Sequence, residues 1–194
     1  MAKIESSFKN MVLTLFAVTL LSSTGVGFVY EATKEAKAKS DLAKKTNAIS
    51  EVVPAFDNNP LEEQYTIDAT NGNQLLCYPA KKGGQTVATA IETTTTKGFS
   101  GDITLIFGLD EKGTIYNIAV LDHKETPGLG DKIDKKKSPF SAQFKSKNPM
   151  TYKLKVKKDG GDVDAITAAT ISSRAFCDAV QQAYVTFMKH HASP

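Results

Sequence analysis

Three consecutive parts of the chain differ in the spacing of their apolar residues. Residues 10–30 contain no charged side chain and lie between Lys9 and Glu31. The next part is rich in alanine, lysine and glutamate, and the remainder alternates short β-rich stretches with turn residues before a final helical pattern. We therefore expect an N-terminal anchor (residues 1–30), a helical stalk (residues 31–53) and a folded body (residues 54–194).

The uncharged run is long enough to cross a membrane. An α-helix rises about 1.5 Å per residue, so residues 10–30 can span a hydrocarbon core about 30 Å thick. Tyr30 ends the run, where interfacial aromatic residues are common. The alternative is a cleaved signal peptide, but its apolar region is usually about 7–15 residues long. Ala36 and Ala38 form a small-x-small pattern well beyond the run. The length favours a single uncleaved transmembrane helix.

The charges beside this helix leave its orientation open. Lys3 and Lys9 precede the run, and a larger group of lysines follows it: Lys34, Lys37, Lys39, Lys44 and Lys45. Counted alone, the lysines favour a cytoplasmic body, because loops rich in lysine and arginine usually stay inside. Long translocated domains can disregard this count.

Residues 31–53 predict a helix that lies next to the body. Alanine, lysine and glutamate are good helix formers. The residue before a proline is steered away from the helical region, so we expect this helix to end before Pro54.

The body begins with stretches that predict an antiparallel sheet. Residues 63–80 read as two strands around the turn at Asn71 and Gly72, and residues 83–96 read as a longer strand whose threonine run, 93–96, we expect to be exposed. Residues 101–110 and 113–122 read as a hairpin. Together they predict successive strands joined by short turns.

The stretch TYKLKVKK, residues 151–158, alternates apolar residues with lysines. A period of two is typical of a strand with one face in solvent. We expect a half-exposed strand here, turned back by Gly160 and Gly161. We interpret its lysines as the solvated face.

The chain ends in a helical pattern with a broad apolar face. The expected members of that face are Ile171, Ala175, Phe176, Ala179, Val180, Ala183, Tyr184 and Phe187. His190 and His191 suit the negative end of this helix better than a metal site. The predicted fold class is α+β: an antiparallel β-sheet packed with helices, preceded by a single N-terminal transmembrane helix.

Charge and cysteine content exclude several kinds of site. The chain has 194 residues, with 24 Lys and Arg against 21 Asp and Glu, and the formal charge of +3 does not indicate nucleic-acid binding. Cys77 and Cys177 lack the spacing of zinc, iron–sulfur or thioredoxin-type sites. We interpret them as buried small apolar residues, with a disulfide between them as the alternative.

Hydroxyl side chains cluster where the last helix is expected to begin. The stretch VDAITAATISSRAF, residues 163–176, contains Thr167, Thr170, Ser172 and Ser173. A helix N-terminus presents unpaired backbone N–H groups and a positive dipole end, and it therefore favours anions such as phosphate. Helix capping is the simpler interpretation, but it accounts for one or two hydroxyls only.

A second unusual stretch is LDHKETPGLGDKI, residues 121–133, which follows a predicted strand. Gly128 and Gly130 permit close approach of the backbone, which either a flat ring system or a tight turn would require. Leu129 between them would be an exposed apolar residue unless a ligand covers it.

Taken together, ETPGLGDKI and DAITAATISS resemble the flavin-binding domain of the G subunit of the Rnf membrane complex. The related C subunit of the sodium-pumping NADH:quinone oxidoreductase shares this domain. The resemblance covers the whole chain and implies an electron-transfer subunit of an ion-translocating ferredoxin:NAD oxidoreductase rather than a stand-alone catalyst. It also implies the inner (cytoplasmic) membrane, an extracytoplasmic body, and other membrane subunits of the complex as partners.

The resemblance implies a covalent FMN on the body. In the family, the last threonine of the motif carries FMN through a phosphoester bond that a flavin transferase forms from FAD with a metal ion. By position, Thr170 matches that threonine, and Ala168 stands where the family usually has glycine. The other matching residues of the motif are Asp164, Thr167, Ala169, Ser172 and Ser173. The flavin ring would lie against the loop that contains His123, Glu125, Thr126, Gly128, Leu129 and Gly130.

Two other functions stay open from the sequence. The chain could be a structural membrane-tethered subunit without flavin. It could also be an FMN carrier of another respiratory reductase, since similar domains serve different partners.

Overall fold

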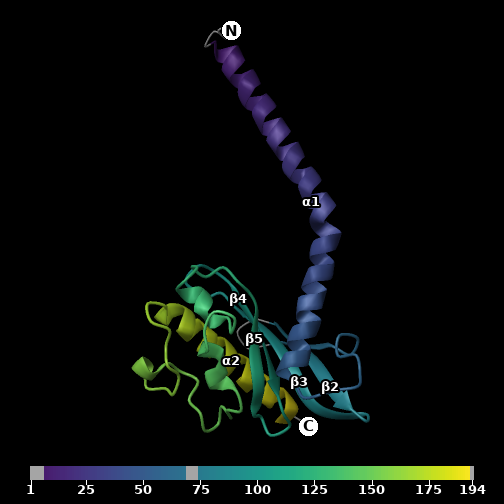
Figure 1. Ribbon diagram of the computed structural model, residues 1–194, viewed down its shortest axis with the longest axis vertical. Coiled ribbons are helices and arrows are strands. Elements are labelled where there is room, and N and C mark those ends of the chain that lie inside the picture. The colour runs from purple at the N-terminus through teal and green to yellow at the C-terminus, as the bar shows by residue number, and fades with distance from the viewer. Residues whose placement is uncertain (1–6, 69–73, 193–194) are drawn as a thin grey trace. The chain divides into compact units, whose positions relative to one another are not determined.

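The first helix is long and continuous. The computed structural model describes residues 7–68 and 74–192, and these divide into two compact units, Met1–Ala43 and Lys44–Pro194. Helix α1 (Phe8–Val52) runs through the first unit into the second (Figure 1). It ends before Pro54, as predicted.

The apolar part of α1 has the properties of a membrane span. An 18-residue window of this helix has a mean hydropathy of 1.9, and 0% of it is buried within the protein. Its apolar side chains, including Leu13, Phe16 and Phe28, are exposed. By length and composition, α1 is a candidate membrane span, which agrees with the predicted N-terminal helix.

The second unit is built on an antiparallel meander of five strands in the order β1-β2-β3-β4-β5. The strands are β1 (Tyr65–Asp68), β2 (Gln74–Lys82), β3 (Gln85–Thr95), β4 (Ile103–Leu109) and β5 (Ile115–His123). Three short 3₁₀ helices and the last helix follow: η1 (Gly130–Ile133), η2 (Phe140–Phe144), η3 (Lys157–Asp159) and α2 (Thr170–Ala192). The predicted α+β class is therefore confirmed. The predicted Asn-Gly turn falls on residues 71 and 72, outside the described residues.

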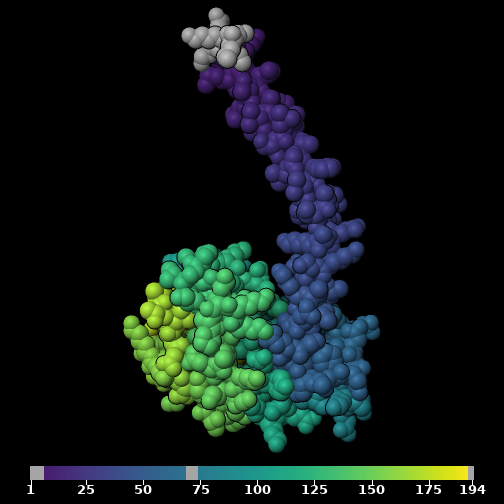
Figure 2. All heavy atoms as spheres, in the orientation of Figure 1, coloured from purple at the N-terminus to yellow at the C-terminus, as the bar shows by residue number. Residues whose placement is uncertain are grey.

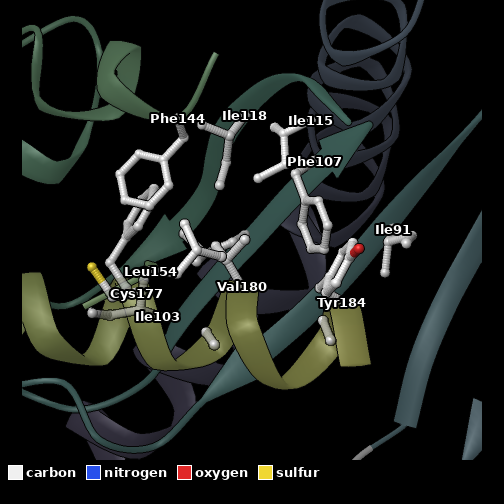
Figure 3. Close-up of a cluster of buried hydrophobic side chains, with 14 of the residues drawn as sticks. Ile91, Ile103, Phe107, Ile115, Ile118, Phe144, Leu154, Cys177, Val180 and Tyr184 are labelled. Atoms are coloured by element: carbon white, nitrogen blue, oxygen red, sulfur yellow. The ribbon is translucent and has the colours of Figure 1, made fainter. Parts of the chain in front are cut away.

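One face of the sheet packs on α2. Neighbouring strands place Cys77, Ile91, Phe107 and Ile118 opposite one another, and all four are buried. Figure 3 shows side chains of the sheet facing Cys177, Val180 and Tyr184 of α2. Burial of each large apolar side chain stabilises the fold by roughly 1.5–3 kcal/mol.

Aromatic rings extend this core beyond the sheet. Phe176 of α2 lies 5.3 Å from Phe140 and 4.9 Å from Phe144 between ring centroids, so η2 packs against the first half of α2. The segment from about residue 125 to residue 160, green in Figure 2, covers this side of the body in that view. It holds the start of α2 against the rest of the domain.

The opposite face of the sheet packs on the end of α1. Ile49, Val52 and Val53 are buried against small strand residues such as Ala88 and Ala90. The small side chains let the helix approach closely. At Gly108 of β4, a Cβ atom would collide with the carbonyl oxygen of Val52.

An ion pair fixes this end of α1 to the sheet. Lys45 Nζ lies 2.9 Å from a carboxylate oxygen of Glu92, and the Tyr78 hydroxyl donates a hydrogen bond of 2.7 Å to the same carboxylate. Residues 44–53 of the predicted stalk therefore pack on the body.

The predicted strand over residues 151–158 is wrong. Leu154 and Val156 are buried and the lysines between them are exposed, so the alternation is real. The backbone, however, bonds locally: Lys153 N–H donates to the Asp162 carboxylate at 2.7 Å, and Val163 N–H donates to the Lys155 carbonyl at 3.0 Å. These hydrogen bonds pair the backbone groups of the segment within a local turn, which has one isolated bridge between Val156 and Val163. The segment therefore does not join the sheet.

Two smaller expectations need correction, and the interpretation of the cysteines is confirmed. Thr93 and Thr95 of β3 are buried, and only Thr94 and Thr96 of the run are exposed. Ile171 is 49% exposed and does not belong to the buried face of α2. The two cysteines are not paired, and burial raises the pKa of each thiol to about 12, so they are buried small apolar residues.

Candidate functional site

The two unusual stretches meet at one cavity. The loop after β5 and the first turn of α2 border a cavity of about 320 Å³. Its lining residues are Phe99, Glu125, Thr126, Leu129, Gly130, Ala168, Ala169, Thr170, Ile171 and Ser172. More than 40 residues separate Glu125 from Thr170 in sequence, so the fold creates this proximity.

Thr170 is the first residue of α2 and lines the cavity. Ala169, just before it, accepts the backbone N–H of Ser173 at 3.0 Å but has no side-chain oxygen that could cap the helix. The first N–H groups of a helix lack intrahelical partners. The helix therefore presents N–H donors and its positive dipole end beside Thr170.

The two serines of the motif bind neighbouring segments. Ser173 Oγ is buried, accepts the N–H of Ile166 at 3.0 Å and donates to the carbonyl of Ala169 at 3.0 Å. Ser172 Oγ is also buried and donates to Glu125 Oε2 at 2.5 Å. These hydroxyls hold the helix start in place, whereas Thr170 is only half-buried.

Ala168 has an uncommon backbone conformation. Its φ is +63°, in the left-handed region that glycine enters freely and alanine rarely adopts. Ala168 is exposed and lines the cavity. The chain thus turns sharply into α2 at the position where a glycine would be least strained.

Glu125 joins three segments at the cavity. Glu125 is only 4% exposed. One carboxylate oxygen accepts the hydroxyl of Ser172 from α2. The other accepts the backbone N–H of Ser100 at 3.1 Å, from the turn before β4. The Glu125 backbone N–H donates to His123 Nδ1 at 3.2 Å.

The two glycines of the loop differ in what they provide. A Cβ at Gly130 would lie under 3.0 Å from Glu125 Oε2 and Ser172 Oγ, so the absence of a side chain leaves room for their hydrogen bond. Gly128 has φ +78° with open space around it, and its role is conformational.

Several residues expected at the site lie away from the cavity. His123 lines a separate polar cavity beside Lys135. Asp164 is exposed, with its carboxylate 2.8 Å from Lys157 Nζ. Thr167, Ser173 and Gly128 are also absent from the cavity lining.

The sequence interpretation missed two residues of the lining, Phe99 and Ile171. Phe99 is 66% exposed, and Ile171 and Leu129 are 49% and 42% exposed. From the sequence, Phe99 could have been noticed as a large apolar residue next to glycines in the turn 97–102. The three side chains give the cavity an apolar rim suited to a flat, partly apolar ligand.

The comparisons with known proteins agree with this geometry. A family model described as an FMN-binding domain matches residues 98–185, which include Phe99, the loop and most of α2. The class of protein is therefore one with an FMN-binding domain.

Relatives match along nearly the whole chain, and each is described as the G subunit of an ion-translocating oxidoreductase complex. The relative from Shewanella amazonensis is 36% identical over 93% of this chain and 88% of its own length. Those from Yersinia pestis and Haemophilus influenzae are 39% and 34% identical over 90% and 98% of this chain, and 86% and 93% of their own lengths. The chain belongs to the family of G subunits of ion-translocating oxidoreductase complexes, the Rnf family.

The residues around the cavity fit FMN. A volume of about 320 Å³ lies in the range of small-molecule sites, roughly 300–1,000 Å³. Phe99, Leu129 and Ile171 can cover a flat ring, while the N–H groups at the start of α2 can bind a phosphate. Among the described residues, no group of three metal-ligating side chains gathers into a metal site.

Proposed function

We propose that this chain is a membrane-anchored electron-transfer subunit that carries FMN on Thr170 through a phosphoester bond. The observation that supports this most directly is the position of Thr170, half-buried, at the start of α2 and in the lining of the cavity that the ETPGLG loop also borders. Neither serine of the motif offers a comparable hydroxyl, since both are buried and hydrogen-bonded to the protein.

Each part of the site has a physical role in this proposal. The N–H groups at the start of α2 hold the phosphate, and the helix dipole stabilises its negative charge. Phe99, Leu129 and Ile171 cover the ring and exclude water from part of it. Bound FMN supplies the capacity to accept and release electrons, while the protein sets its position and its potential.

The attachment requires help from a second protein. A threonine hydroxyl is a weak nucleophile unless a base or metal activates it, and the carboxylate in the cavity lining, Glu125, already accepts the hydroxyl of Ser172. The resemblance to the family implies a flavin transferase that uses FAD: the phosphoester to the Thr170 oxygen forms as the bond to the AMP half of FAD breaks, and AMP leaves. Because Thr170 begins a helix at a half-open cavity, its hydroxyl remains accessible to such an enzyme.

The relatives' names describe a complex, and we propose that this chain works in one. Its partners would be the other membrane subunits of an Rnf-type ferredoxin:NAD oxidoreductase, with α1 as the anchor in the inner membrane. The body would lie on the extracytoplasmic side. Covalent attachment suits such a carrier, because the flavin cannot diffuse away between electron transfers.

The first test is attachment of FMN in a host that has the transferase. The wild-type chain should show the added mass of one FMN and in-gel fluorescence after denaturation. Thr170→Ala should lose both while keeping its fold, because loss of a hydroxyl at a helix start costs about 0.5–2 kcal/mol. Thr167→Ala is the matched control: Thr167 is exposed and outside the cavity lining, so this variant should keep the bond.

Two results would contradict this assignment. If the wild-type chain carried no FMN in that host, the covalent carrier function would be wrong and a structural role would remain. If Thr170→Ala still carried FMN, the attachment residue would be another hydroxyl.

A further inference from the structure

The buried carboxylate of Glu125 is unusual for its position. The residue is 4% exposed, and its carboxylate accepts hydrogen bonds from Ser172 Oγ at 2.5 Å and Ser100 N–H at 3.1 Å. These donors belong to the first turn of α2 and to the turn before β4. Glu125 therefore connects three segments that border the cavity.

The chain leaves space for this carboxylate on two sides. A Cβ at Gly98 would lie under 3.0 Å from Glu125 Oε1, and a Cβ at Gly130 would lie under 3.0 Å from Glu125 Oε2. Both oxygens thus sit where only glycine fits beside them. Two donors and two such glycines thus surround the Glu125 carboxylate.

Glu125 is also the only ionisable side chain among the residues that line this cavity in the described part of the chain. A charge removed from water interacts more strongly with its neighbours, because the protein interior has a lower effective dielectric constant. Salt screens a buried charge much less than an exposed one. The charge of Glu125 thus acts on whatever occupies the cavity.

We propose that Glu125 is a positioning residue that holds the loop against α2 and whose negative charge lowers the midpoint potential of the flavin. This rests on the proposed function, since it takes FMN as the occupant. Addition of an electron beside a fixed negative charge is disfavoured, so the charge makes the bound flavin a stronger reductant. The same carboxylate restrains the segments that carry Leu129 and Thr170.

The electrostatic part is tested on the full-length, flavin-carrying protein. Glu125→Gln keeps the shape of the side chain and removes the charge, so the midpoint potential, followed by visible absorbance during reductive titration, should become more positive. Glu125→Asp retains the charge and should restore a potential near that of the wild type. Glu111→Gln, at an exposed turn carboxylate, is the matched control and should leave the potential unchanged.

The positioning part is tested on protein produced without the flavin transferase. In Glu125→Gln, amide hydrogen exchange of residues 125–130 and 170–173 should become about tenfold faster, because a charge-assisted hydrogen bond is replaced by a weaker neutral one. Ser172→Ala should accelerate exchange similarly, because it removes the same hydrogen bond while the Glu125 side chain is unchanged. In protein produced with the flavin transferase, loss of attachment in Glu125→Gln with retention in Glu125→Asp would also support the positioning role.

The outcomes separate this inference from the function on which it rests. An unchanged potential in flavin-carrying Glu125→Gln would overturn the electrostatic role, as would an equal shift in Glu125→Asp. Unchanged exchange in Glu125→Gln would overturn the positioning role. A wild-type chain without FMN would refute the proposed function, and the exchange measurement would still decide whether Glu125 holds the segments together.

Discussion

Ala168 is a residue whose conformation conflicts with its side chain. Its φ of +63° costs an L-residue roughly 1–2 kcal/mol. Glycine removes that cost, but it also increases the entropy of the unfolded chain, which cancels about 0.4–1 kcal/mol of the gain in stability. Ala168→Gly should therefore raise the free energy of unfolding by about 0.5–1 kcal/mol, measured by urea denaturation.

A matched alanine provides the control for this prediction. Ala142 is exposed in η2 and is not among the described residues with positive φ. Ala142→Gly should lower the free energy of unfolding, because only the entropic term applies there. Equal destabilisation by both variants would show that the conformation of Ala168 is not strained.

The loop glycines give a second prediction at the residue scale. Gly130→Ala forces a Cβ against the Glu125 carboxylate and the Ser172 hydroxyl, so it should change the visible flavin spectrum and cost about 1–3 kcal/mol of stability. Gly128→Ala meets no atom and suffers only the left-handed φ, so it should cost stability while leaving the spectrum unchanged. A changed spectrum in Gly128→Ala alone would reverse these roles.

At the scale of elements, the β-rich stretches and the turn residues between them predicted most of the sheet. The strands β1 to β5 and the helix α2 lie where the β-rich stretches and the helical spacing placed them. The segment 151–158 failed because alternation reports which side chains are buried and does not report backbone pairing. Its N–H groups found partners in Asp162 and in neighbouring carbonyls, which the pattern of apolar residues cannot reveal.

At the site, too, the sequence motifs predicted individual residues but not the contacts between distant parts of the chain. Thr170, Leu129 and Gly130 were predicted from two motifs, and the fold brings them to one cavity. Phe99 comes from a third segment with no motif of its own. The bond from Ser172 to Glu125 spans 47 positions in sequence. No local pattern indicates such a pairing, since it depends on how the sheet orders its strands.

On the scale of the whole molecule, α1 serves two environments. Its buried residues, Ala48, Ile49 and Val52, all lie in the last turns, within the second unit. The apolar stretch before them is exposed and suits a hydrocarbon core. The end of the helix is therefore part of the domain, and its beginning is separable from it.

This division predicts how truncation should act. Removal of residues 1–30 should give a folded body that stays in solution without detergent, because every buried residue of α1 is retained. Removal of residues 1–53 should destabilise the body by several kcal/mol, since Ile49, Val52 and Val53 each contribute roughly 1.5–3 kcal/mol by burial. Thermal unfolding and gel filtration measure both effects. The full-length chain should remain in the membrane pellet after carbonate or high-salt washing, and its release by either wash would refute α1 as a membrane anchor.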